Sequence, residues 1–346
     1  MNSFSAVIIR WFRENGRDLP WRETRDPYAI WLSEIILQQT RIAQGWEYWE
    51  RFMQTYPKVE DLAAASEDDV LKLWQGLGYY SRARNLHTAA KQIVALGAFP
   101  NTLDGIKSLK GVGDYTAAAI GSFAFDIPAA VVDGNVYRVL SRYFGIDTPI
   151  NSTQGKKEFA ALAQSLLPAS DAASYNQGMM DFGAIQCTPQ SPKCLLCPLA
   201  ETCEALRCGR VEELPVKNKT VKVKTRHLSY IYIRCKSSAA DGAGNTEPMV
   251  AIHRRGEGDI WQGLWEPYNV SDVKELPSFV KNPILLAKDV KHVLTHRILL
   301  ADFYLLETES RPQLPDDYIW IRESEIEDYG VPRLIEIMLE KINPVE

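Results

Sequence analysis

Residues 109–138 read LKGVGDYTAAAIGSFAFDIPAAVVDGNVYR, and this stretch decides the fold. Gly111 and Gly113 flank one valine, so the backbone there can bend tightly and approach a ligand without an intervening Cβ. Asp114 follows as an N-cap, and the alanine-rich, apolar residues 115–125 predict a buried helix. A tight turn that feeds a helix N-terminus presents unpaired N–H groups, which favour an anion such as a DNA phosphate. Taken alone, the same pattern also describes an ordinary corner between two helices.

Asp133 precedes a second helix, predicted over residues 134–144. A helix N-terminus favours an ionised carboxylate, so this aspartate can both cap the helix and hold a negative charge ready for chemistry. The segment LKGVGDYTA resembles the helix-hairpin-helix of the DNA glycosylase superfamily that includes endonuclease III, and Asp133 matches the essential aspartate of that superfamily. The resemblance implies that Asp133 stabilises positive charge on a deoxyribose.

The composition is compatible with two or more domains, since 346 residues with 46% hydrophobic content can bury sizeable cores. The N-terminus has no signal-peptide pattern and no apolar run is long enough for a membrane span, so we expect a soluble, cytoplasmic protein without membrane partners. The net charge of -5 argues against nucleic acid, but the placement of charge matters more than its sum. Residues 215–236 are rich in Lys and Arg and hold no acid, which suits either a DNA contact or a solvated linker.

Five of the six cysteines lie between Cys187 and Cys208, and such crowding in an intracellular chain indicates a metal centre rather than disulfides. Spacing alone leaves a zinc site and an iron-sulfur cluster both open, because each uses four thiolates. The pattern resembles the 4Fe-4S loop that ends the catalytic domain of endonuclease III-like glycosylases. This resemblance implies a 4Fe-4S cluster, with Cys208 and Cys235 as structural residues. The four ligands it implies are Cys187, Cys194, Cys197 and Cys203.

Glu34 lies inside the apolar part of a helix predicted from Pro27 to about Tyr48, with Asp26 as its cap. Most helical glutamates face solvent, but one that faces a pocket has a raised pKa and can act as a general acid near neutral pH. The segments RDLPWR and SEIILQQT resemble those of MutY-type adenine DNA glycosylases. That resemblance implies that Glu34 protonates the adenine.

The same family resemblance extends to the DNA-contacting positions. Aromatic and basic residues in GLGYYSR suit base stacking and phosphate pairing, although an aromatic corner in the core would also explain them. In the family, a tyrosine at position 79 wedges into the duplex. The contacts implied are Arg22, Leu37, Gln39, Thr40, Tyr79, Gly111, Gly113, Thr295 and His296.

Position 115 departs from the strand-cutting members of the superfamily, in which a lysine forms a Schiff base with the sugar. Tyr115 cannot do so, and the resemblance therefore implies base removal without an efficient lyase step. Asn135 matches the adenine-specific branch, where it helps to hold the aspartate, and Tyr115 is expected to support the same carboxylate. Asp114 is also a departure, since it adds an acid beside the expected phosphate.

After Cys208 the pattern changes to short apolar or alternating runs, which predict a small domain with an antiparallel sheet and a helix over 332–341. The segments IWQGLWEPY and KHVLTHRILLADFYLL resemble the Nudix-like C-terminal domain of the same family. The acidic Nudix box is missing, so pyrophosphate hydrolysis is not expected. In the family, a Phe-Ser-His type loop inspects 8-oxoguanine. Here Leu294 loses the aromatic face, Thr295 keeps a hydroxyl and His296 is retained.

The sequence therefore predicts an all-α helix-hairpin-helix glycosylase domain with a cluster loop (1–212), a basic linker (213–226) and a smaller α+β Nudix-like domain (227–346). The resemblance implies a monomeric, bacterial-type, nucleoid-associated enzyme that excises adenine opposite 8-oxoguanine or guanine in double-stranded DNA. Either carboxylate, Glu34 or Asp133, could activate the water. Two alternatives stay open, namely a bifunctional glycosylase and lyase for pyrimidine lesions, and a non-catalytic DNA-binding iron-sulfur protein.

Overall fold

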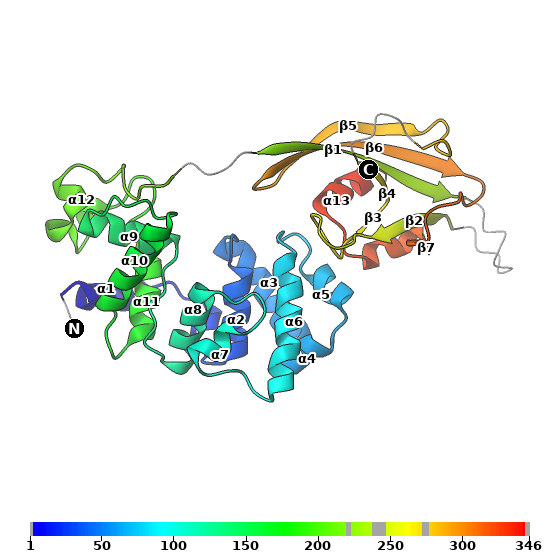
Figure 1. The fold of residues 1–346 in the computed structure, drawn as a ribbon. Coiled ribbons are helices and arrows are strands. Elements are labelled where there is room, and N and C mark those ends of the chain that lie inside the picture. Colours follow the sequence, from blue (N-terminus) through cyan, green and yellow to red (C-terminus); the bar gives the residue numbers. More distant parts are fainter. Residues whose placement is uncertain (1–2, 219–222, 237–246, 272–276, 343–346) are drawn as a thin grey trace. The chain divides into compact units, whose positions relative to one another are not determined.

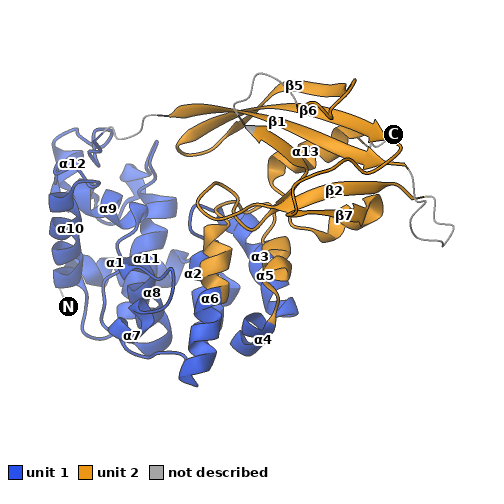
Figure 2. Ribbon diagram, turned by 45° about the vertical axis from the view of Figure 1, so that its right-hand side comes forward, with its two compact units in different colours: residues 1–64, 88–219 blue, residues 65–87, 220–346 orange. Residues whose placement is uncertain are grey.

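The computed structural model describes residues 3–218, 223–236, 247–271 and 277–342 (Figure 1). The chain divides into two compact units (Figure 2), the first made of Met1–Ala64 and Thr88–Lys219 and the second of Ala65–His87 and Thr220–Glu346. Among the helices of the described ranges, none has both the length and the apolar character that a membrane span requires. Each unit has its own hydrophobic core.

The first unit is helical. Its α-helices are α1 (Ser3–Asn15), α2 (Pro27–Ile36), α3 (Ile42–Thr55), α4 (Val59–Ala64), α6 (Ser81–Leu96, which begins in the second unit), α7 (Leu103–Lys107), α8 (Asp114–Phe125), α9 (Gly134–Phe144), α10 (Thr153–Leu166), α11 (Ala172–Asp181) and α12 (Glu204–Arg207). Short helices of other types are η1 (Pro20–Arg22), the π-helical turn η2 (Phe182–Gln186), η3 (Cys194–Leu196) and η4 (Ala200–Thr202). Helix α8 packs against both α2 and α7, and α9 packs against α11.

The single helix predicted from Pro27 to Tyr48 is two helices. Asp26 caps α2 as predicted, since its side chain accepts from the backbone N of Tyr28 at 3.0 Å. The helix ends at Ile36 because Gln39 has a left-handed backbone, with φ of 58°, which no helix can accommodate. The chain therefore turns directly after the segment that carries Glu34.

The second unit is built on one mixed sheet. Its strands are β1 (Lys224–Cys235), β2 (Met249–Arg254), β3 (Trp265–Glu266), β4 (Tyr268–Ser271), β5 (Ile284–Val293), β6 (Arg297–Thr308) and β7 (Tyr318–Arg322), and the order along the main path is β3-β2-β1-β6-β5. The prediction of an antiparallel sheet is wrong for the central pair, because β1 and β6 run parallel over their whole length. Helices η5 (Glu323–Asp328) and α13 (Arg333–Ile342) follow β7, with α13 packed on β5 and β6.

Residues 65–87 belong to the second unit, although the sequence assigns them to the first domain. This segment contains α5 (Glu67–Leu73) and is held by side chains from the sheet and from α13. Arg254 donates to Glu67 at 2.9 Å, and Arg84 donates to the carbonyl of Gln262 at 2.6 Å. These partners are far apart in sequence, so local patterns could not reveal them.

The basic stretch 215–236 is not a free linker throughout. Strand β1 begins at Lys224, inside the predicted linker, and Arg226 bonds both oxygens of Asp259 at 2.7 and 2.8 Å. Arg234 pairs with Glu323 and Lys236 with Glu307. Long-range partners thus neutralise part of this charge, while residues 219–222 lie outside the described ranges.

Candidate active site

Glu34 is buried in the first unit, with only 7% of its surface exposed. Every residue of α2 from Tyr28 to Ile36 is buried, so this helix has no solvent face on which a glutamate could lie. Burial raises the pKa of Glu34 to about 7. A hydrogen bond from Tyr115 and the charge of Arg22 lower it, and the negative charge of Asp133 adds to the increase. Glu34 can therefore hold a proton near neutral pH.

Tyr115 lies in the first turn of α8 and its side chain hydrogen-bonds to Glu34. Burial, together with the nearby charges of Glu34 and Asp133, raises its pKa well above the usual range, so the phenol stays neutral and donates. The sequence predicts support of Asp133 by this residue. The bond that the structure gives it is to Glu34, so Tyr115 orients the candidate acid.

Asp133 caps α9, as predicted. One of its oxygens accepts from the backbone N of Asn135 at 2.8 Å and of Val136 at 2.7 Å, and the other accepts from the side-chain amide of Asn135 at 2.8 Å. Burial raises the pKa of Asp133, and these bonds counteract that effect. The carboxylate is therefore fixed in orientation, with Asn135 supporting it as expected.

Arg138 connects this carboxylate to the cysteine-rich loop. It is buried, and its Nη2 donates to the side-chain oxygen of Asn135 at 2.8 Å and to the carbonyl of Gly183 at 2.6 Å. Its Nε donates to the carbonyl of Cys187 at 2.7 Å. Asn135, which holds Asp133, is thus held in turn by Arg138, and the backbone of the first cysteine of the loop fixes Arg138.

Gly183 makes a contact that only glycine allows. A methyl group added to it would lie 2.5 Å from the Cβ of Asn135 and 2.9 Å from its Cα. We expect Gly183→Ala to displace Asn135 and the carboxylate it holds, and to slow the reaction that the sequence predicts for that carboxylate about 10- to 100-fold in single-turnover measurements. Gly178→Ala is the matched control, because its added methyl would contact only Ile8 and Phe12 in the core. It should lower the melting temperature and leave the rate unchanged, and equal rates for the two variants would contradict this account.

The four predicted cluster ligands gather in one loop of the first unit, and none forms a disulfide. Burial raises the pKa of the Cys197 thiol to about 11, with further increases from the charges of the other three cysteines. The buried Arg142 donates to the sulfur of Cys187 at 3.5 Å and to the carbonyl of Thr188 at 2.7 Å. Within the described residues, no three His, Cys or carboxylate side chains are placed to hold a single metal ion. A four-iron cluster makes a different demand, since each thiolate binds a separate iron, and four free thiols beside an arginine donor suit it.

Cys235 is buried, as a structural cysteine should be, whereas Cys208 is exposed and donates to the Glu204 carboxylate at 3.2 Å. Because Cys208 is exposed, the structure does not support the structural role that was expected for it.

Arg22 occupies an interior position, with 12% of its side chain exposed. It bonds both oxygens of the fully buried Asp181 at 2.8 Å, and Arg17 bonds the same carboxylate. Burial opposes ionisation of Asp181, but the bonds from Arg22 and Arg17 lower its pKa overall. Sequence reasoning missed Asp181, although an acid within the apolar run GMMDFGAI is a sign that a buried partner exists.

Apart from Arg22, which is paired with the buried Asp181, the predicted DNA-contacting residues of the first unit lie in two turns. Leu37, Gln39 and Thr40 form the turn between α2 and α3, with Gln39 exposed. Gly111 has a positive φ of 78°, and Gly113 is the N-cap of α8. Asp114, predicted as the cap, is instead the first helical residue, and its charge is paired with Lys107.

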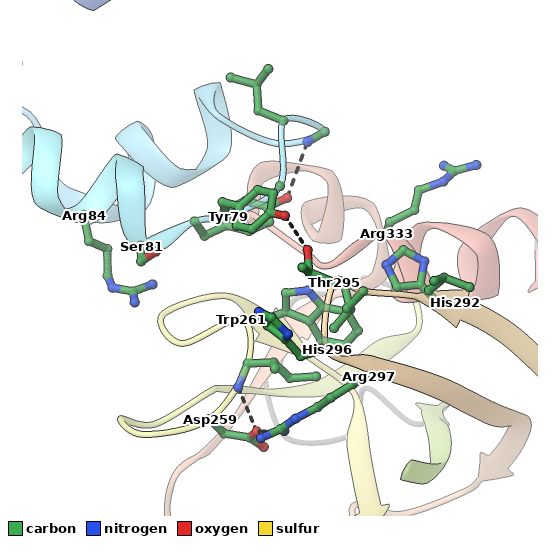
Figure 3. A pocket seen from close by; sticks show the side chains of 17 residues that line it. Tyr79, Ser81, Arg84, Asp259, Trp261, His292, Thr295, His296, Arg297 and Arg333 are labelled. Atoms are coloured by element: carbon green, nitrogen blue, oxygen red, sulfur yellow. Dashed lines mark hydrogen bonds and ion pairs between the residues drawn. The ribbon is translucent and has the colours of Figure 1, made fainter. Parts of the chain in front are cut away.

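The second unit contains a cavity of about 640 Å³. Tyr79 is 50% exposed at its edge, and its hydroxyl lies 2.5 Å from the hydroxyl of Thr295 (Figure 3). Thr295 and His296 form the tip of the β5–β6 hairpin, which is closed by the backbone bond from Leu294 to Arg297 at 2.8 Å. The structure thus brings together the three residues of the second unit that were predicted to contact DNA. Trp261, His292, Arg297 and Arg333 also line the cavity.

Comparisons with known proteins agree with this arrangement. The family model for HhH-GPD superfamily base excision DNA repair proteins matches residues 32–168, the NUDIX domain model matches 244–341, and the iron-sulfur binding domain of endonuclease III matches 187–203. The last match confirms the expected 4Fe-4S cluster and decides against zinc.

Two relatives are adenine DNA glycosylases. That of Buchnera aphidicola subsp. Schizaphis graminum is 30% identical over 97% of this chain and 98% of its own length. That of Mus musculus is 42% identical over 62% of this chain and 44% of the mouse protein.

Solved structures match the first unit. A thermostable thymine-DNA glycosylase has a TM-score of 0.56 at 34% identity, over 59% of this chain and 95% of that one. A trapped endonuclease III-DNA covalent intermediate has a TM-score of 0.52 at 24% identity, over 59% of this chain and 94% of that chain. A likeness at this level of identity shows only that the fold is shared. The predicted fold class, a helical helix-hairpin-helix domain followed by a Nudix-like domain, is confirmed. The chain belongs to the adenine DNA glycosylase family of base excision repair enzymes, which are hydrolases of N-glycosyl bonds.

Proposed function

We propose that this enzyme excises adenine mispaired with 8-oxoguanine or guanine in double-stranded DNA, with Glu34 as the general acid. The observation that carries the proposal is the buried Glu34 carboxyl, with a pKa of about 7 and a hydrogen bond from Tyr115. The nearby charge of Asp133, which contributes to that pKa, supports a site with two carboxyl groups in different protonation states.

The proposed reaction begins when the adenosine leaves the base stack and approaches Glu34 and Asp133 in the first unit. The exposed Gln39 and the half-buried Leu37 and Thr40 lie on the turn next to the helix of Glu34, which suits contact with the vacated stack. The hairpin glycines and the N-terminus of α8 suit a backbone phosphate. The four cysteines would hold the cluster, which when bound would link distant parts of the segment 187–203 covalently.

Glu34 then protonates adenine, at N7, and so makes it a better leaving group. As the N-glycosyl bond breaks, positive charge develops on the sugar and the ionised Asp133 stabilises it. Asn135 keeps that carboxylate oriented through its bond of 2.8 Å. Water completes the hydrolysis. The neutral phenol of Tyr115 offers no amine for a Schiff base, which supports a monofunctional enzyme.

The rate of base release is expected to fall both at high pH and at low pH. Glu34 must be protonated, so the rate should fall about tenfold per pH unit above its pKa of about 7. Asp133 must be ionised, so the rate should also fall at low pH, below its raised pKa. Single-turnover rate constants across pH would give this bell shape, and Glu34→Gln should lose the alkaline limb. A wild-type profile that stays flat through pH 7 would exclude Glu34 as the acid.

Recognition of the opposite base is proposed for the cavity of the second unit. The hydroxyl pair of Tyr79 and Thr295 supports this assignment, because a purine that carries extra hydrogen-bonding groups can engage it. Thr295→Val keeps the shape and removes the hydroxyl, and we expect the preference for 8-oxoguanine over guanine to drop about 3- to 10-fold. Thr308→Val, at the far end of β6, is the control, since no hydrogen bond to its side-chain oxygen is found in the part of the chain that is described. An unchanged preference in Thr295→Val would reject this role.

The proposed function is tested by single-turnover base release from duplexes with adenine opposite 8-oxoguanine, guanine or thymine, and with thymine opposite guanine. Product should form from adenine opposite 8-oxoguanine and guanine, and strand breaks should appear only after alkali. Strand cutting without alkali would contradict the monofunctional mechanism. Release of thymine alone would contradict the assignment of adenine as the excised base.

A further inference from the structure

The extended segment 127–132 joins α8 to α9 and ends directly at Asp133. Within the part of the chain that the structure describes, no strand pairs with this segment, so its backbone groups need other partners. Two side-chain amides from distant helices provide them: Gln164 on α10 and Asn176 on α11. We call this pair the amide clamp.

The amide clamp bonds four consecutive residues in alternation. Gln164 donates to the carbonyl of Pro128 at 3.0 Å and accepts from the N of Ala130 at 2.9 Å. Asn176 donates to the carbonyl of Ala129 at 2.8 Å and accepts from the N of Val131 at 3.1 Å. Each amide therefore donates one bond to this segment and accepts one from it, as the backbone of an adjacent β-strand would do.

The two members of the clamp differ in burial. Asn176 is 1% exposed, and its amide nitrogen also donates to the hydroxyl of Ser122 at 2.9 Å. Its backbone partners lie on buried residues, Ala129 and Val131, so no water could replace it. Gln164 is exposed, and water can take over its bonds. Asn176 should therefore carry most of the effect.

We propose that Asn176, assisted by Gln164, is a positioning residue for Asp133. Val131 precedes Asp133 by only two residues, so a shift of the clamped backbone moves the carboxylate. Catalytic groups tolerate little displacement, and an error of about 1 Å can cost about 100-fold in rate. This inference rests on the proposed role of Asp133 in the reaction.

The test measures single-turnover base release and duplex affinity for the whole enzyme. Asn176→Ala should reduce the rate about 10- to 100-fold and leave the affinity for the duplex unchanged. Gln164→Ala, at an exposed position that should not endanger folding, should reduce the rate about threefold. The stability control is Ser141→Ala, which removes the 2.6 Å bond from a buried hydroxyl to the carbonyl of Ile146 at the other end of α9. This control should lower the melting temperature and not the rate.

A double-mutant cycle with Asp133→Glu separates positioning from general support of the fold. That substitution keeps a carboxylate but displaces it, so a measurable rate should remain. If Asn176 acts through Asp133, the combined loss will be much smaller than the product of the two single losses. Fully multiplicative losses, for both Asn176→Ala and Gln164→Ala, would overturn the inference. A wild-type rate for Asp133→Glu and Asp133→Asn would instead overturn the proposed function.

Discussion

Replacing Glu34 by glutamine should lower single-turnover release of adenine about 10²- to 10⁴-fold while duplex binding stays intact. The amide has nearly the same shape, so it can keep the contact with Tyr115, but it has no acidic proton that it could transfer to adenine. The measurement is a rate constant at saturating enzyme, together with affinity for the same duplex. A variant that retains more than a tenth of the wild-type rate would contradict the assignment.

Stability provides the control for this substitution. The pKa of Glu34 is raised from 4.5 to about 7, so the folded protein binds the proton more tightly than the unfolded chain does. The contribution of Glu34 to the free energy of unfolding should therefore be largest at low pH, fall between about pH 4.5 and 7, and stay low above pH 7. Above pH 7 the folded protein contains a buried, ionised carboxylate at position 34, which destabilises it, and the neutral glutamine removes this cost. Glu34→Gln should therefore be more stable than the wild type at pH 8 by up to about 3 kcal/mol. Loss of activity with a gain in stability cannot come from misfolding.

Replacing Asp133 by asparagine should reduce base release about 10²- to 10³-fold. The neutral amide cannot stabilise positive charge on the sugar, but asparagine is a good N-cap, so α9 should remain intact. Asp26→Asn is the matched control, because Asp26 caps α2 through the N of Tyr28 at 3.0 Å. This second variant carries the same chemical change in the same unit and should keep the wild-type rate.

Circular dichroism and thermal melting check that both cap variants fold. If Asp133→Asn and Asp26→Asn lose the same small fraction of activity, Asp133 is a helix cap and nothing more. If Asp133→Asn alone loses activity, the carboxylate acts on the reaction.

The elements that the sequence predicts well are the ones defined by local signals. Helices α8 and α9 follow from the glycine turns, the alanine content and the Asp133 cap, although the cap of α8 is Gly113 and not Asp114. The family resemblance supplied Glu34, whose burial comes from the wholly apolar helix around it. The pattern could not show that this helix stops at Ile36, because the left-handed backbone of Gln39 carries no sequence signal of its own.

The supporting residues could not be predicted, since each acts across the fold. Asn176 lies 45 residues from Val131, and Arg138 lies 49 residues from Cys187. An asparagine or an arginine in a helix is usually solvated, and only the packing shows that these two are buried and fully bonded. The parallel pairing of β1 with β6 could not be predicted either, because alternation of apolar residues does not encode the direction of a partner strand.

Glu34 is proposed to hold a proton at neutral pH inside the folded enzyme. Infrared difference spectroscopy between the wild type and Glu34→Gln, from about pH 5 to about pH 9, measures this protonation directly through the C=O stretch of the carboxylic acid. The account predicts a band that is present at pH 6 and is half lost near pH 7. Loss of that band near the ordinary glutamate pKa, or its absence throughout the range, would contradict the account.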